Sequence, residues 1–108
     1  MPHAELKYSA DLDLDANAVL REIEAVIQRR DAGAGACKGR AYPTDRFNHT
    51  HCLLTVSMLT KPHRDEAWTA ELLAELKAAL GALLEQRCYL SIGIEFTGSS
   101  YITAEHLP

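Results

Sequence analysis

The sequence lacks the features that mark several common classes of protein. Its 108 residues carry 11 basic and 15 acidic side chains, which gives a formal net charge of −4. A nucleic-acid-binding chain normally shows a basic face, so we expect no nucleic-acid partner. No apolar run approaches the roughly 20 residues of a membrane span, and the first residues lack the apolar core of a signal peptide. We therefore expect a cytoplasmic protein with no membrane partner.

Motifs for metals, cofactors and covalent nucleophiles are also missing. Cys37, Cys52 and Cys88 are an odd number without a Cys-x-x-Cys pair, which predicts reduced thiols rather than a disulfide framework. His49 and His51 could present two imidazoles on one strand face, but a zinc site needs at least one further ligand. The chain has no Gly-rich phosphate loop and no Gly-x-Ser-x-Gly elbow. We expect neither a metal nor a cofactor.

What the sequence does contain is one pattern that occurs twice. HAELKYS at 3–9 and HCLLTVS at 51–57 share His, Leu and Ser at matching positions, and each precedes a polar loop and a helical pattern. The predicted apolar stripes are Val19, Leu20, Ile23, Val26 and Ile27 in the first helix, and Trp68, Leu72, Leu76, Leu80 and Leu83 in the second. Asp13 or Asp15 and then Asp65 are the expected N-caps, and Gly33 and Gly35 are expected to end the first helix.

These elements predict an α+β fold built from duplicated β-α-β units. Alternating apolar residues mark strands at 52–58 and 90–96, and a weaker strand pattern covers 36–43. We expect a single domain over 1–108, with repeats at about 1–48 and 49–96 and a tail at 97–108. Parallel pairs with right-handed crossovers would form a four-stranded mixed sheet with both helices on one face. The other face carries Leu53, Leu59 and Tyr89, so we expect an oligomer.

Pro2 is the first candidate for chemistry. A proline is tolerated as the first residue of a strand, which is one interpretation of the MPHAELKY start. The other is that removal of Met1 leaves Pro2 with a free secondary amine. Burial and nearby cations would lower the pKa of this amine and make it a usable base.

Several cations could hold a carboxylate substrate near such a base. Lys38 and Arg40 alternate along the strand at 36–43, Arg46 lies in the next loop, and Lys61 and Arg64 precede the second helix. A guanidinium matches a carboxylate with two parallel hydrogen bonds. The pattern therefore indicates a small polycarboxylate as substrate.

Four segments, MPH, CKGRAY, HRDEAW and LLEQRCYLSIGIEF, together resemble the tautomerase superfamily over nearly the whole chain. The likeness is greatest to its branch of 5-carboxymethyl-2-hydroxymuconate isomerases. The resemblance implies a cofactor-independent isomerase in aromatic-compound catabolism, acting on a 2-hydroxymuconate-like carboxylate as a homotrimer. It also implies that Pro2 is the general base and acid and that Arg40 binds the substrate carboxylate, supported by Arg64 or Lys38. Tyr101 would lie at a subunit boundary beside the active site and would also bind the substrate.

The chain departs from the family pattern in three places. The loop SADLDLDAN lacks an arginine, Lys38 stands where the family has arginine, and His63 precedes Arg64 where the branch often has glycine. Two alternatives to the isomerase remain, and the replaced cation and the missing loop arginine would fit the second. One is a decarboxylase or hydratase of oxo acids that uses the same proline, and the other is a non-catalytic oligomeric binding module.

Overall fold

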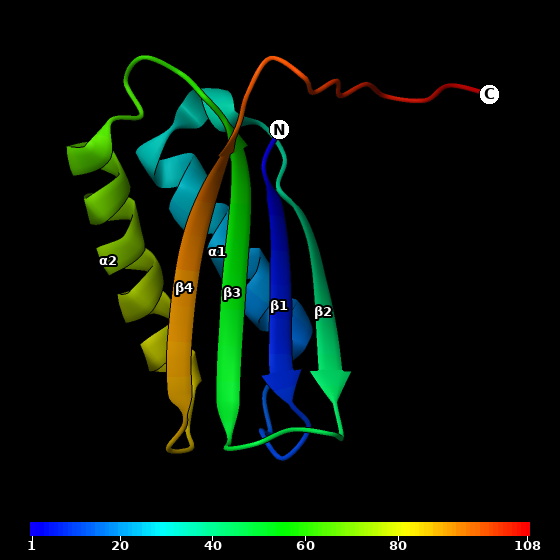
Figure 1. Ribbon diagram of the computed structural model, residues 1–108, viewed down its shortest axis with the longest axis vertical. Coiled ribbons are helices and arrows are strands. Elements are labelled where there is room, and N and C mark those ends of the chain that lie inside the picture. Colours follow the sequence, from blue (N-terminus) through cyan, green and yellow to red (C-terminus); the bar gives the residue numbers. More distant parts are fainter.

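The computed structural model describes residues 1–108, with the elements in the predicted order (Figure 1). They are β1 (His3–Ser9), α1 (Ala16–Arg30), the short 3₁₀ helix η1 (Ala32–Ala34), β2 (Lys38–Thr44), β3 (His51–Leu59), α2 (Glu66–Leu83) and β4 (Tyr89–Thr97). The weaker strand pattern corresponds to β2. Neither α1 nor α2 has the length and apolar character needed to span a membrane.

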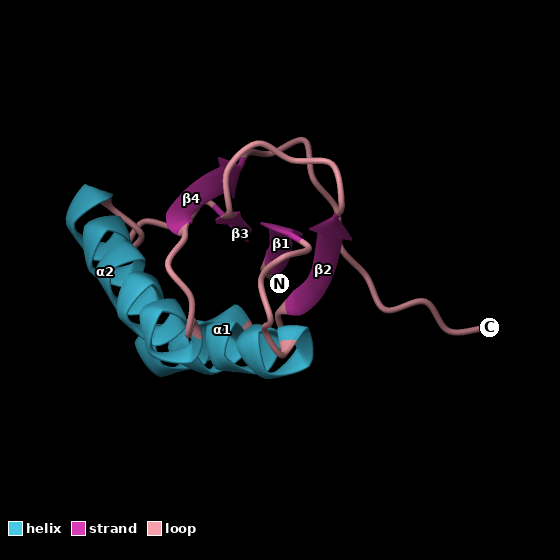
Figure 2. Cartoon of the chain, turned by 90° about the horizontal axis from the view of Figure 1, so that it is seen from below, coloured by secondary structure: helices cyan, strands magenta, loops and turns pink.

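The strands form one sheet in the order β2-β1-β3-β4. Each β-α-β unit contributes a parallel pair, and the units join where β1 runs antiparallel to β3. Both helices cover the same face of the sheet and leave the other face open (Figure 1 and Figure 2). The predicted α+β fold, with a four-stranded mixed sheet and two helices on one face, is confirmed.

The core lies between the sheet and the helices. Alternate residues of the two central strands point into it, and Leu6, Leu54 and Val56 are fully buried there. The buried helical residues all belong to the predicted stripes: Val19, Ile23, Val26, Ile27, Leu72, Leu76 and Leu80. In the second β-α-β unit the apolar patterns predict burial up to the last residue, whereas the structure leaves Leu83 38% and Phe96 37% exposed. Leu83 is the last residue of α2, and Phe96 lies near the end of the edge strand β4.

The helix caps match the sequence at the N-termini and differ at one C-terminus. The side chains of Asp15 and Asp65 accept hydrogen bonds from backbone N–H groups of the first helical turns. α1 ends before Gly33, because the N–H of Asp31 donates to the carbonyl of Ile27 and the chain then enters η1. This ending places the Asp31 carboxylate beside the loop that precedes α2.

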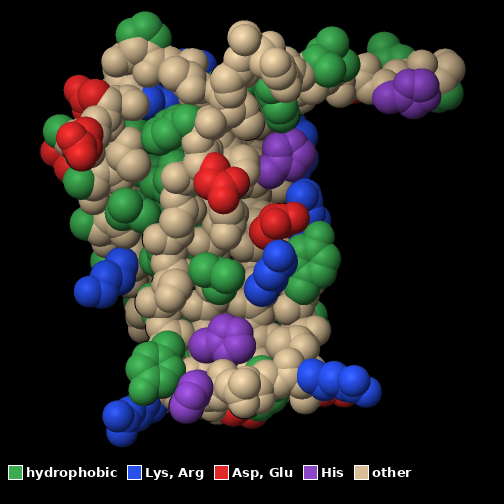
Figure 3. Space-filling view, viewed as in Figure 1, with side chains coloured by type: hydrophobic (Ala, Val, Ile, Leu, Met, Phe, Trp, Pro, Cys, Tyr) green, Lys and Arg blue, Asp and Glu red, His purple; other side chains and the backbone are tan.

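The open face of the sheet mixes charged and apolar side chains (Figure 3). The register sets Glu5 of β1 opposite Arg40 of β2, so an ion pair forms on this face. Leu53 and Tyr89 are also exposed, as expected from the sequence. A partner that covers this face must therefore match charges as well as apolar surface.

Candidate active site

The start of β1 lies at the end of the sheet where three other segments meet it. β2 runs parallel to β1, which places Lys38 opposite His3. β3 runs antiparallel to β1, so the end of β3 and the loop at 60–65 reach the same place. Figure 1 shows the N-terminus between the start of β2 and the end of β3. The fold thus brings Pro2, Lys38 and Arg64 to one end of the sheet.

Pro2 is fixed immediately before β1. Its side chain is fully buried, and its carbonyl oxygen accepts a hydrogen bond of 2.9 Å from the N–H of Lys38. The strand itself begins at His3, so the missing N–H of proline leaves no gap in the ladder. The ring and the carbonyl hold Pro2 in place, and its nitrogen has no structural hydrogen bond to make.

The terminal amine of the chain lies among cations. Burial lowers the pKa of the Met1 α-amine below its ordinary value of 8.0, and the charges of Lys38, Lys61 and Arg64 lower it further. An amine in this position holds its proton less tightly than an exposed one. A general base that works near neutral pH needs that property.

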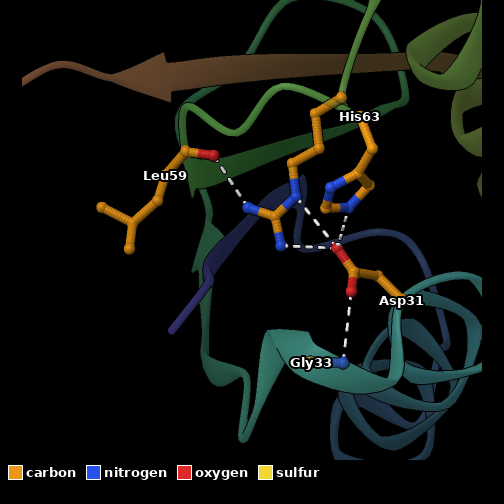
Figure 4. A network of polar contacts seen from close by, with 5 residues as sticks. Asp31, Gly33, Leu59 and His63 are labelled. Carbon is orange, nitrogen blue, oxygen red and sulfur yellow. Dashed lines mark hydrogen bonds and ion pairs between the residues drawn. The ribbon is translucent and has the colours of Figure 1, made fainter.

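Arg64 is held by a buried ion pair with Asp31 (Figure 4). Its Nε and Nη2 donate to Asp31 Oδ2 over 3.0 and 2.8 Å, and its Nη1 donates to the carbonyl of Leu59 over 2.8 Å. His63 Nε2 lies 2.8 Å from the same Oδ2, and the N–H of Gly33 donates to Oδ1. This network ties the loop at 60–65 to the end of α1.

The charge state of Asp31 reflects these contacts. Burial raises the pKa of its carboxyl, but hydrogen bonds from His63 and Arg64 outweigh burial and lower the pKa to about 2. The guanidinium of Arg64 also lies over the ring of Trp68, 5.6 Å from the centroid. Only 3% of the Arg64 side chain is exposed. Arg64 therefore acts on the terminal amine as a fixed buried charge.

Arg40 lies on the open face and is already paired. Its Nη2 is 2.9 Å from Glu5 Oε1, its Nε is 3.2 Å from the same oxygen, and its Nη1 is 3.4 Å from His3 Nδ1. It is not among the groups that lower the pKa of the terminal amine. Direct binding of a substrate carboxylate by Arg40 stays a prediction, and it requires the pair with Glu5 to open.

Lys38 and Lys61 differ from the two arginines because neither forms an ion pair. The Lys38 ammonium turns toward the N-terminus and contacts the sulfur of Met1. Lys61 is half-buried in the loop after β3. In the sequence Lys61 is one candidate cation among several. Its position three residues before Arg64 was the feature that could have indicated a place near the site.

Tyr101 lies in the tail beyond β4, where it is half-buried. Figure 1 shows this tail leaving the sheet at the end that holds the N-terminus. None of the hollows of the single chain is lined by Pro2 or Tyr101. One hollow lies beside Arg64 and Phe96, and another, between α1 and α2, is lined by Glu22, Arg29, Arg30, Trp68, Glu75, Ala78 and Ala79. Pro2 thus lies at an open end of the sheet, next to the start of the tail.

Neither the models of protein families nor the curated proteins gave a match to this chain, whereas solved structures did. A 5-carboxymethyl-2-hydroxymuconate delta-isomerase is 24% identical, with a TM-score of 0.79 over 98% of this chain and 89% of that one. A 5-carboxymethyl-2-hydroxymuconate isomerase from Deinococcus radiodurans R1 is 21% identical, with a TM-score of 0.69 over 97% and 90%. A fused 4-OT wild-type symmetric trimer is 12% identical, with a TM-score of 0.75 over 97% and 94%.

Each of these structural similarities extends over almost the whole of both chains. The other proteins therefore share the arrangement of both β-α-β units, not of one unit alone. At such identities the comparison establishes the fold. The chain has the fold of the tautomerase superfamily, as its sequence resemblance predicted.

Proposed function

We propose that this chain is a cofactor-independent keto–enol isomerase with Pro2 as general base and acid. The observation that carries the proposal is the position of Pro2, which is buried immediately before β1 at the end of the sheet where the start of β2 and the loop at 60–65 meet. The substrate class is a 2-hydroxymuconate-like carboxylate, with 5-carboxymethyl-2-hydroxymuconate of aromatic-compound catabolism as the specific candidate. This choice is supported by the fold that the chain shares with two isomerases of that compound.

The reaction follows from the chemistry of a secondary amine. Once Met1 is removed, the Pro2 nitrogen has a lone pair that takes the proton of the substrate 2-hydroxyl. The electrons of that O–H bond form a carbonyl, and the double bonds shift along the conjugated chain. The protonated amine returns the proton to the carbon at the far end. The reaction consumes nothing, and the surrounding cations stabilise the dienolate that forms between the two proton transfers.

The substrate-binding residues expected from the sequence receive different roles. Lys38 is free to contact a carboxylate, whereas Arg64 contributes its field from a buried position. Arg40 contributes only if it exchanges Glu5 for the substrate. Tyr101 is assigned to a subunit boundary near Pro2.

We also propose that the chain acts as a homotrimer. The open face carries exposed apolar residues, Leu53 and Tyr89, and both edge strands, β2 and β4, are unpaired in the single chain. One of the matching structures is a symmetric trimer. Neighbouring subunits would cover the open face and give the exposed end at Pro2 the walls of a pocket.

A non-catalytic binding module with this fold is the second candidate. The observation in its favour is that Glu5 and Asp31 already occupy the guanidinium groups of Arg40 and Arg64, the two arginines expected to bind substrate. A decarboxylase or hydratase of oxo acids with the same base is a third possibility within the enzyme class.

The test is to block the nitrogen of Pro2. The wild-type chain is purified, its intact mass establishes whether Met1 has been removed, and the isomerisation of 5-carboxymethyl-2-hydroxymuconate is followed by ultraviolet absorbance. A variant with one additional residue retained before Pro2 has an amide nitrogen there and should lose all activity. Pro2→Ala, with a primary amine, should keep reduced activity, and Pro108→Ala in the tail is the matched control.

Circular dichroism must show that each variant keeps the fold. Full activity in the blocked chain would show that Pro2 only begins a strand. A folded chain with a free Pro2 that isomerises none of a series of 2-hydroxydienoates would favour the binding module.

A further inference from the structure

The end of the sheet opposite Pro2 carries a second group of side chains, which the proposed isomerase does not use. The loop before β3 and the loop before β4 meet there (Figure 1). Figure 3 shows histidine, hydrophobic and basic side chains together at this end of the open face. A hollow of about 400 Å³ lies here, and its lining contains no carboxylate: His49, Thr50, Arg87, Cys88 and Tyr89. That volume lies within the range of small-molecule sites.

His49 is held in a conformation that side chains rarely adopt. Its φ of 63° lies in the left-handed region, where the chain otherwise has only a glycine. The next two residues fix this geometry. The carbonyl of Thr50 accepts a hydrogen bond of 3.0 Å from the N–H of Tyr89, and the N–H of His51 donates to Ser9 Oγ over 2.9 Å. Backbone strain imposed in this way is concentrated at functional sites.

The polar side chains of the hollow are available to a ligand. Arg87 is exposed and forms no ion pair. The hydrogen bonds made by histidine rings all involve other histidines, so the ring nitrogens of His49 have no partner in the chain. A neutral imidazole has one N–H donor and a guanidinium has five. An incoming anion therefore meets two unoccupied groups of donors, whereas the Thr50 hydroxyl already donates to Asp11.

Tyr89 adds an aromatic wall beside these donors. It is the first residue of β4, and 69% of it is exposed. The ring of His49 meets the Tyr89 ring edge-on, with the centroids 6.0 Å apart and the planes at 83°. This contact leaves further surface of the tyrosine ring open, on which another aromatic ring can stack.

We propose that His49, Arg87 and Tyr89 form a binding site for a small aromatic carboxylate. The carboxylate pairs with the guanidinium of Arg87 and accepts a hydrogen bond from the imidazole of His49, and the ring of the ligand stacks on Tyr89. The nine residues of β3 separate this site from the end at Pro2 by roughly 25–30 Å. The site is therefore distinct from the proposed active site and does not depend on it.

The experiment titrates the assembled chain with benzoate and follows the backbone amide signals by NMR at both ends of the sheet. The shifts should occur at residues 49–51 and 87–89. Benzamide, which has the same ring without the charge, should bind at least about fivefold more weakly. Cyclohexanecarboxylate, which has the charge without a flat ring, should bind about threefold or more weakly.

Three substitutions assign the contacts. Arg87→Gln should weaken benzoate binding at least about fivefold, a modest factor because Arg87 is exposed to water. Tyr89→Leu should weaken it about threefold. His49→Gly removes the imidazole where glycine suits the positive φ, so the fold should be kept while benzoate binding falls by about threefold or more. Arg21→Gln, at an exposed arginine of α1 without an ion pair, is the matched control and should retain the wild-type affinity.

Shifts confined to the end at Pro2 overturn the proposed site, as does the absence of binding in the assembled chain, where a neighbouring subunit would then fill the hollow. Equal affinity for benzoate and cyclohexanecarboxylate also overturns it, because charge alone would then be recognised. Unchanged affinity in folded Arg87→Gln has the same consequence.

Discussion

Replacing Asp31 with asparagine should destabilise the protein strongly, although the two side chains have nearly the same shape. Burial opposes ionisation of Asp31, yet hydrogen bonds from His63 and Arg64 lower the carboxyl pKa from 3.8 to about 2. That difference corresponds to about 2.5 kcal/mol of stability at neutral pH. Only 9% of the Asp31 side chain is exposed, so water replaces little of the interaction that is lost.

The substitution also leaves Arg64 without its counter-ion. The guanidinium would remain buried with the carbonyl of Leu59 as its strong acceptor. Removing one partner of a buried ion pair typically costs about 3–5 kcal/mol. We therefore expect Asp31→Asn to lower the free energy of unfolding by about 3 kcal/mol and Tm by about 10 °C or more. Glu5→Gln, which breaks the exposed pair with Arg40, is the control and should cost less than about 1 kcal/mol.

Urea unfolding at one fixed protein concentration measures both effects, since assembly makes stability depend on concentration. The pH dependence provides a second check. Asp31 has a folded pKa below its ordinary value, so its contribution is complete above pH 3.8 and is lost as the pH falls toward about 2. Wild type and Asp31→Asn should therefore converge at the acid end. A difference below about 0.5 kcal/mol at neutral pH, or parallel pH curves, would refute the reasoning.

Three further predictions concern the site and the assembly. The cations that lower the pKa of the Met1 amine also lie near Pro2, so the kcat/KM of the chain with a free Pro2 should rise with pH through a pKa below the ordinary α-amino range of about 7.7–8.0. A flat profile would exclude a titrating amine. Lys61→Gln should shift this pKa upward, because it removes a neighbouring positive charge. Arg40→Ala should leave Tm nearly unchanged and raise KM less than Lys61→Gln does; a larger rise would place Arg40 in direct contact with substrate. Light scattering at micromolar concentration should give three times the mass of one chain, and a monomeric mass would contradict the trimer.

The parts of the fold that depend on local patterns were predictable from the sequence. Period-2 and period-3.6 apolar patterns identified β3, β4 and both helices, and Asp15 and Asp65 mark the helix starts by their own hydrogen bonds. β2 was the weakest pattern. Gly39 supplies no side chain at an inward position of this strand, where an added Cβ would lie 3.0 Å from Leu20.

The pairing of charges was not predictable, because it depends on tertiary structure. Arg40 meets Glu5 only through the register of β1 with β2, and Arg64 meets Asp31 only because α1 ends before Gly33. The sequence offers five candidate cations: Lys38, Arg40, Arg46, Lys61 and Arg64. The folded chain pairs Arg40 and Arg64 with carboxylates and leaves Lys38, Arg46 and Lys61 without an ion pair. This difference changes which residues are expected to bind the substrate.

The loop at 60–65 connects stability to the proposed chemistry. His63 stands where the branch that the sequence resembles often has glycine. In the structure His63 adds a third hydrogen bond to the Asp31 oxygen that holds Arg64, and its ring packs edge-on against Trp68 with the ring centroids 5.8 Å apart. A glycine could provide neither contact. The substitution therefore strengthens the anchor of the loop that presents Lys61 beside the terminal amine, and it is compatible with a working site.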